Sequence, residues 1–103
     1  MGLNRMMMKN GNPKDVFIAY IDRTIRQFED NALTTVGNGA FFGCSLLTSI
    51  NLPNVTTVEN YAFNGCSSLK EIHFAAKNKE AIEALSDYSN KFGATNATIY
   101  FDI

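Results

Sequence analysis

The sequence has almost no excess of either charge. Nine lysine and arginine residues stand against ten aspartate and glutamate residues, so the net charge of the 103-residue chain is −1. A chain so balanced creates no field that would attract the phosphates of nucleic acid or an anionic lipid surface. We therefore expect no nucleic acid among the partners of this protein.

Long apolar runs are also missing. No segment approaches the roughly 20 apolar residues that a membrane-spanning helix needs. The methionine-rich start is interrupted by Arg5 and Lys9 before an apolar export signal can form. We expect neither a membrane partner nor export for the chain as it stands.

Cysteine and histidine are scarce. Two cysteines without a Cys-x-x-Cys pair are too few for a disulfide scaffold or a zinc site, and His73, the single histidine, cannot belong to a multi-histidine metal site. Residues 37–39 read Gly-Asn-Gly but lack the Gly-Lys-Ser/Thr ending of a phosphate-binding loop. Because no nucleophile, base and stabiliser occur together, the sequence predicts no catalytic residues, no metal, no cofactor and no enzyme.

The chain does contain enough apolar residues for one folded domain over residues 1–103. Hydrophobic residues make up 46% of the sequence and charged residues 18%, as in ordinary globular domains. A chain of this length buries about two thirds of its unfolded surface in one core. A second independent domain would not fit.

An internal repeat organises that core. At an offset of 22 residues, positions 36–52 match positions 58–74, with nine identical residues among the 17 compared. Such self-similarity at a fixed period is typical of solenoids, in which stacked coils share one core. The identical pairs are Val36/Val58, Asn38/Asn60, Ala40/Ala62, Phe41/Phe63, Gly43/Gly65, Cys44/Cys66, Ser45/Ser67, Leu47/Leu69 and Ile50/Ile72.

The chemistry of one coil explains the repeated residue types. In the pattern Leu-x-x-Ile-x-Leu, a short strand points its apolar side chains inward and leaves Ser49 and Asn51 outside. Each Ala-Phe pair predicts a short helical turn, and Gly43 and Gly65 are expected in the left-handed conformation that ends it. The predicted core residues are Phe41, Cys44, Leu47, Ile50, Phe63, Cys66, Leu69 and Ile72.

The consensus Val-x-x-x-Ala-Phe-x-x-Cys-x-x-Leu-x-x-Ile-x-Leu-Pro-x-Val-Thr-x-Val resembles the BspA-type, or treponemal-type, leucine-rich repeat of bacterial and phage proteins. The resemblance covers residues 25–74, and Glu59 departs from it where the family usually has glycine. It implies an α/β fold, a short leucine-rich-repeat solenoid of about two and a half coils. The arrangement is also similar to short repeat proteins of gut bacteria and their phages. Because the sequence shows neither an export signal nor a membrane-spanning segment, we expect the chain as it stands to be cytoplasmic or virion-associated.

So short a solenoid must cover its terminal coils, which predicts caps over residues 1–24 and 75–103. In the first cap, Asn12 and Pro13 begin a predicted helix over residues 13–23. In the second, Asn78 begins a helix that Gly93 ends, followed by a closing strand over residues 97–101. The residues Ala81, Leu85, Tyr88 and Phe92 are expected on one buried face of this helix.

Cys44 and Cys66 occupy the same phase of adjacent coils, so their backbones should lie about 5 Å apart. That separation is within the range of a disulfide. Two reduced thiols buried as small apolar groups are the favoured interpretation, because nothing in the sequence provides the exposed, low-pKa thiolate of a redox site.

The register also aligns a polar row on the outside of successive strands. Its members are Gln27, Glu29, Ser49, Asn51, Glu71 and His73. Such a row is the usual contact surface of leucine-rich solenoids, although a merely solvated face is the favoured explanation of the row by itself. The resulting hypothesis is a non-enzymatic protein-interaction module that binds a protein partner through this face. The alternative is a structural or assembly component, acting by self-association as a homo-oligomer or as a phage tail-associated part.

Overall fold

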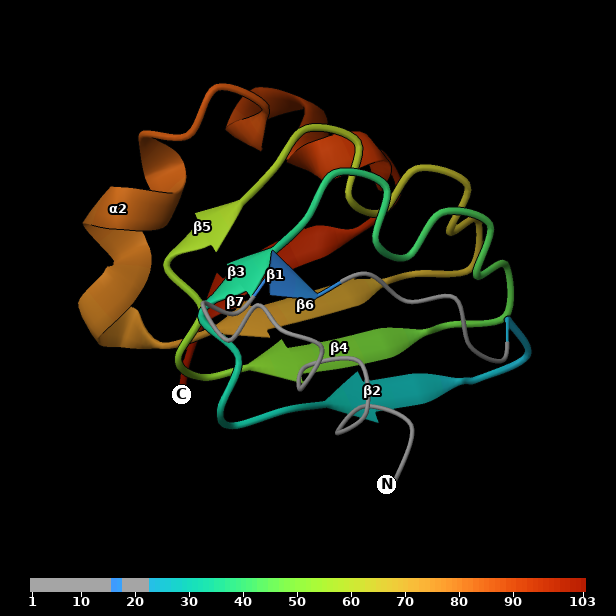
Figure 1. The fold of residues 1–103 in the computed structure, drawn as a ribbon, viewed down its shortest axis with the longest axis horizontal. Helices are drawn as coiled ribbons and strands as arrows, with labels where there is room; N and C mark the ends of the chain where they lie inside the picture. The colour runs from blue at the N-terminus through green and yellow to red at the C-terminus, as the bar shows by residue number, and fades with distance from the viewer. Residues whose placement is uncertain (1–15, 18–22) are drawn as a thin grey trace.

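The computed structural model describes residues 16–17 and 23–103, which form two parallel sheets (Figure 1). The larger sheet has the order β2-β4-β6-β7 and the smaller has the order β1-β3-β5. The larger sheet contains β2 (Gln27–Glu29), β4 (Ser49–Leu52), β6 (Glu71–Phe74) and β7 (Thr98–Phe101), and the smaller contains β1 (Val16–Phe17), β3 (Thr35–Val36) and β5 (Thr57–Val58).

The 22-residue offset read from the sequence is the register of the strands. Ser49 pairs with Glu71 and Ile50 with Ile72 in the larger sheet, and Thr35 pairs with Thr57 in the smaller. Each full coil therefore gives one strand to each sheet. Backbone hydrogen bonds extend this pairing to the residues just before β2, β4 and β6. The amide of Thr48 donates to the carbonyl of Arg26 at 2.8 Å, and the amide of Lys70 donates to the carbonyl of Thr48 at 3.0 Å. The amide of Thr98 donates to the carbonyl of Lys70 at 2.9 Å.

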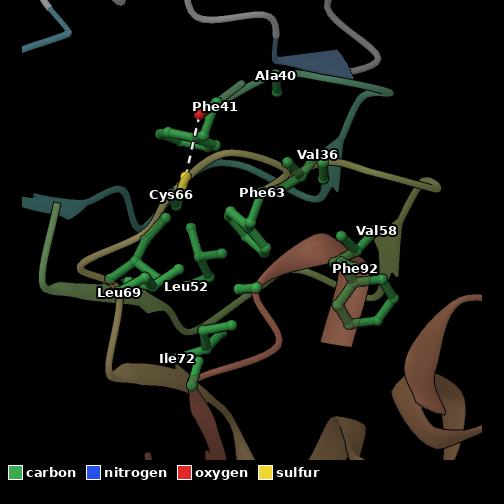
Figure 2. Close-up of a cluster of buried hydrophobic side chains, with 14 of the residues drawn as sticks. Val36, Ala40, Phe41, Leu52, Val58, Phe63, Cys66, Leu69, Ile72 and Phe92 are labelled. Carbon is green, nitrogen blue, oxygen red and sulfur yellow. Dashed lines mark hydrogen bonds between the residues drawn. The ribbon is translucent and has the colours of Figure 1, made fainter. Parts of the chain in front are cut away.

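A column of phenylalanine rings fills the space between the sheets. The ring centroids of Phe28 and Phe41 lie 5.0 Å apart, those of Phe41 and Phe63 lie 5.5 Å apart, and those of Phe63 and Phe92 lie 6.4 Å apart. Phe41, Phe63 and Phe92 are fully buried. All eight core residues expected from the repeat are buried, and Figure 2 shows several of them converging.

Both cysteines lie in this core as free thiols. The Sγ of Cys66 donates to the backbone carbonyl of Phe41 in the neighbouring coil at 3.1 Å (Figure 2). Burial, followed by the proximity of Cys44, raises the pKa of the Cys66 thiol to about 12. At neutral pH this thiol carries its proton, so it is inert as a nucleophile.

Two repeated glycines allow the coils to approach closely. Gly43 and Gly65 have φ angles of 78° and 85°, as expected for residues that end the Ala-Phe turns. A Cβ atom on Gly65 would lie 3.0 Å from the backbone nitrogen of Gly43. Glycine is therefore needed at position 65 for both its backbone angle and its contact with the preceding coil.

The helix predicted over residues 13–23 is wrong wherever the structure describes it. Val16 and Phe17 form β1, which pairs in parallel with Thr35 and Val36, and Arg23 lies in a turn. Pairing with an existing sheet edge satisfies the backbone groups of this segment, and this tertiary contact overrides the local helical pattern. The other residues of the predicted helix lie outside the described part of the chain.

The segment predicted as one helix from Asn78 to Gly93 contains two short helices, and a third short helix ends at Asn78. These are η1 (Ala76–Asn78), α2 (Lys79–Glu83) and η2 (Tyr88–Gly93). Asn78 makes no side-chain cap, and Ala81 is exposed while its neighbour Ile82 is buried. The backbone turns left-handed at Lys91 and Phe92. This break places Phe92 against the coil that contains Phe63. The carbonyl of Phe92 accepts a hydrogen bond from the amide of Phe63 at 2.8 Å.

The closing strand lies within the predicted residues 97–101. β7 pairs in parallel with β6, and this register places Ile99 beside Ile72 and Phe101 beside Phe74. Figure 1 shows α2 beside β5, so the helical insertion between β6 and β7 covers the small-sheet side of the molecule. The outer face of the larger sheet is on the opposite side.

Candidate functional site: the outer face of the larger sheet

The six polar residues predicted to form a row make two adjacent columns on this outer face. Strand pairing aligns each column, because residues in register on parallel strands point to the same side of the sheet. The first column is Gln27, Ser49, Glu71 and Thr98, and the second is Glu29, Asn51, His73 and Tyr100. None of the eight side chains is fully buried.

The two ends of the face differ in shape. At the β2 end, a shallow hollow is lined by Gln27, Phe28, Glu29, Ser49 and Asn51. At the β7 end, Tyr100 is 39% exposed and its ring stacks on that of His73, with centroids 4.9 Å apart and an interplanar angle of 12°. The face therefore combines a polar depression with a flat aromatic pair.

His73 is held between two carboxylates. Its Nδ1 atom lies 2.9 Å and 3.0 Å from the two carboxylate oxygens of Asp102, and its Nε2 atom lies 2.8 Å from Oε1 of Glu71. The side chain of His73 is only 18% exposed. Because both ring nitrogens face acidic oxygens, neither is directed at a nucleophile, and the arrangement is not that of a general base.

This environment changes the ionisation of the ring. Burial acts to lower the pKa of His73, but hydrogen bonds to Asp102 and Glu71, together with their charges, outweigh burial. The pKa of His73 is therefore raised above its ordinary value of 6.5. The two carboxylates thus favour the positively charged ring over the neutral one.

The repeat register did not predict the residues that complete the face at the β7 end. Tyr100 follows His73 by 27 residues, five more than the repeat period, because the last coil contains the helical insertion. The alternation of residues 97–101 could have placed Tyr100 opposite Ile99 and Phe101. Asp102 follows the last strand, and its contact with His73 had no signal in the sequence.

Among the described residues, no group of three or more histidine, cysteine, aspartate or glutamate side chains could hold a metal ion. Within the same part of the chain, no helix is both long and apolar enough to cross a membrane.

A family model described as the BspA-type leucine-rich repeat region (6 copies) matches residues 20–96. The chain belongs to the BspA-type leucine-rich repeat family. This match extends beyond Phe74, through the helical insertion, and ends at residue 96, before β7 begins. The family suggests a protein-interaction module, and its repeats are typically non-enzymatic. Neither the curated proteins nor the solved structures gave a match.

Proposed function

We propose that this BspA-type repeat protein binds a protein partner through the outer face of β2, β4, β6 and β7. The observation that carries the proposal is the alignment of eight incompletely buried side chains in two columns on one regular face. The family supports the general role of an interaction module.

The face suits recognition because its side chains stand on a rigid frame. Neighbouring parallel strands lie about 4.8 Å apart, so polar groups are presented at fixed intervals, and ordering them on binding costs little additional entropy. Tyr100 adds the kind of aromatic group that is enriched at interfaces. Four short strands give a contact area at the lower end of specific interfaces.

The test uses a matched pair of double variants. Asn51→Ala with His73→Ala removes two neighbouring side chains from the central part of the face. Thr34→Ala with Thr56→Ala removes two exposed side chains on the small-sheet side, again at one repeat phase. A photo-crosslinking residue at position 51 would first identify the partner, which is then purified for affinity measurements.

We expect the Asn51/His73 variant to lose at least tenfold in affinity and the Thr34/Thr56 variant to bind as the wild type does. Both should retain their circular dichroism spectra. Unchanged affinity of the Asn51/His73 variant would exclude the central part of this face and direct attention to the small-sheet side.

A second candidate function is assembly with further copies, and one observation favours it. β7 is the last strand of the larger sheet, and its inward residues Ile99 and Phe101 are only partly buried, whereas Ile72 and Phe74 on β6 are fully buried. Sedimentation velocity over a range of concentrations tests this role. Self-association through this edge predicts species at multiples of 11.4 kDa, and a monomer at every concentration would exclude it.

A further inference from the structure

The hydrogen-bond partners of His73 determine which protonation state of its ring fits the structure. An ionised carboxylate only accepts hydrogen bonds, and a neutral imidazole has a single N–H to donate. His73 nevertheless has carboxylate oxygens within hydrogen-bonding distance of both ring nitrogens. The observed arrangement is therefore satisfied only when the ring is doubly protonated and positively charged.

The two carboxylates are not held equally. The backbone on either side of Asp102 is fixed, because β7 precedes it and the amide of Ile103 donates to the carbonyl of Phe74 at 3.3 Å. The carbonyl of Ile103 in turn accepts the amide of Ala76 at 3.1 Å. Asp102 also presents both oxygens to Nδ1. Glu71 presents a single oxygen to Nε2 from a longer side chain.

The other residues of the two columns carry no positive charge that would replace the charge of the ring after it loses a proton. On β7, Tyr100 stacks on the ring. On β4, the residue in register with His73 is the uncharged Asn51, and beyond it on β2 is Glu29, which adds a further negative charge to the same column. No lysine or arginine belongs to either column.

We propose that the outer face is a pH-dependent contact surface, on which the proton at Nε2 of His73 decides where the Glu71 carboxylate lies. With that proton present, Glu71 is drawn in and the cluster of Glu71, His73 and Asp102 carries a net charge of −1. When the proton passes to water, the ring keeps its Nδ1–H bond to Asp102, and the Nε2 lone pair faces Glu71. The Glu71 carboxylate then moves away, and the net charge of the cluster becomes −2.

The consequence for binding rests on the proposed contact role of this face, but the switch itself does not. It can be measured on the free protein, so that its failure and the failure of the proposed function are distinguishable. Because the cluster is negative on both sides of the transition and Glu29 lies in the same column, the partner that fits this face has a positively charged surface, and it would bind more tightly above the transition.

The experiment is an NMR titration of His73 in the full chain. Since this is the single histidine, its ring signals need no assignment. We expect a midpoint above 6.5 in the wild type and lower midpoints in Asp102→Asn and Glu71→Gln. The control Glu29→Gln removes a charge two strands away, so its midpoint should fall by less than in either of those variants. Above the midpoint, the ring nitrogen shifts should report a proton on Nδ1.

A wild-type midpoint at or below 6.5 in the folded protein would overturn the proposal. So would equal midpoints in the wild type and in both the Asp102→Asn and Glu71→Gln variants, or a neutral ring protonated on Nε2. The Glu71→Gln variant provides a second test should Asp102→Asn loosen the end of the chain, since Glu71 is exposed and its backbone is fixed within β6.

Discussion

Glu59 is joined to Asn38 across the boundary between two coils. Its Oε1 atom accepts a hydrogen bond from the backbone amide of Asn38 at 3.0 Å. The amide of Glu59 itself donates to the carbonyl of Val36 at 2.9 Å. Glu59 therefore contacts the preceding coil through both its backbone and its side chain, at the position where the family usually has glycine.

Replacing Glu59 with alanine should lower the stability of the stack. The lost hydrogen bond leaves the amide of Asn38 to solvent, and a bond of this kind contributes about 0.5 to 1.5 kcal/mol to the free energy of unfolding. Urea denaturation measures the change, with Glu29→Ala as the control glutamate on an exposed strand position. Equal midpoints for the two variants would show that the side-chain bond across the coils contributes nothing.

Phe63→Ala is expected to cost about 3 to 5 kcal/mol, because it opens a cavity between two neighbouring rings of the column. That loss is a large part of the total stability of a domain of this size. The control is Phe42→Ala, whose ring is 53% exposed. A melting temperature for Phe63→Ala within a degree or two of the wild type is incompatible with the buried column.

Gly39 and Tyr61 occupy equivalent positions in successive coils and share a left-handed backbone, with φ angles of 66° and 61°. A Cβ atom on Gly39 would meet nothing within 4 Å, so Gly39→Ala tests the backbone angle alone. We expect this change to destabilise the protein by about 1 kcal/mol. Tyr61→Gly should be neutral or stabilising, because it relieves the same strain. Thermal melts of both variants decide this, and a stabilising Gly39→Ala would contradict the assignment.

The two thiols should react slowly with a thiol reagent in the folded protein and rapidly in denaturant. Burial protects both of them, and the pKa of about 12 for Cys66 leaves almost no thiolate at neutral pH. Titration with and without guanidinium measures the number of thiols that react in the unfolded and the folded protein. A denatured sample that shows no free thiol in the absence of reductant would instead indicate a disulfide.

The contribution of His73 to stability should fall as pH rises above about 6.5. The pKa of His73 is raised in the folded state, so protonation stabilises the fold fully below the unfolded value near 6.5. That contribution is lost as pH rises through the higher folded pKa. Denaturation midpoints at several pH values measure the loss, and the variant His73→Gln should show a flatter profile over the same window. Identical profiles for the two proteins would refute the linkage.

The repeat predicted most of the larger sheet because its signal is periodic. Ile50, Ile72 and their neighbours recur at one spacing, and residues in that register stack whatever the rest of the chain does. The helix predicted from Asn78 was wrong because the structure there depends on a tertiary contact, which a local sequence pattern does not contain. Phe92 has to complete the ring column over Phe63, and this contact requires a left-handed break instead of another helical turn.

The candidate face was likewise predicted only in part from the sequence. Six of its eight column residues followed from the strand register, whereas Thr98 and Tyr100 lie after a coil of irregular length. The carboxylate of Asp102 reaches His73 from outside any strand. Contacts of that kind depend on where the chain returns in space, which no period in the sequence encodes.

The middle ring of the phenylalanine column has a consequence for how the protein unfolds. Phe63 touches a ring on either side, and the coil that carries it is bonded to both of its neighbours. In a long solenoid, such nearest-neighbour coupling lets one end fray while the other persists. Here the central coil is part of both interfaces, so its loss leaves neither flanking coil with a partner. The chain should therefore melt in a single cooperative transition, with no half-folded intermediate at equilibrium.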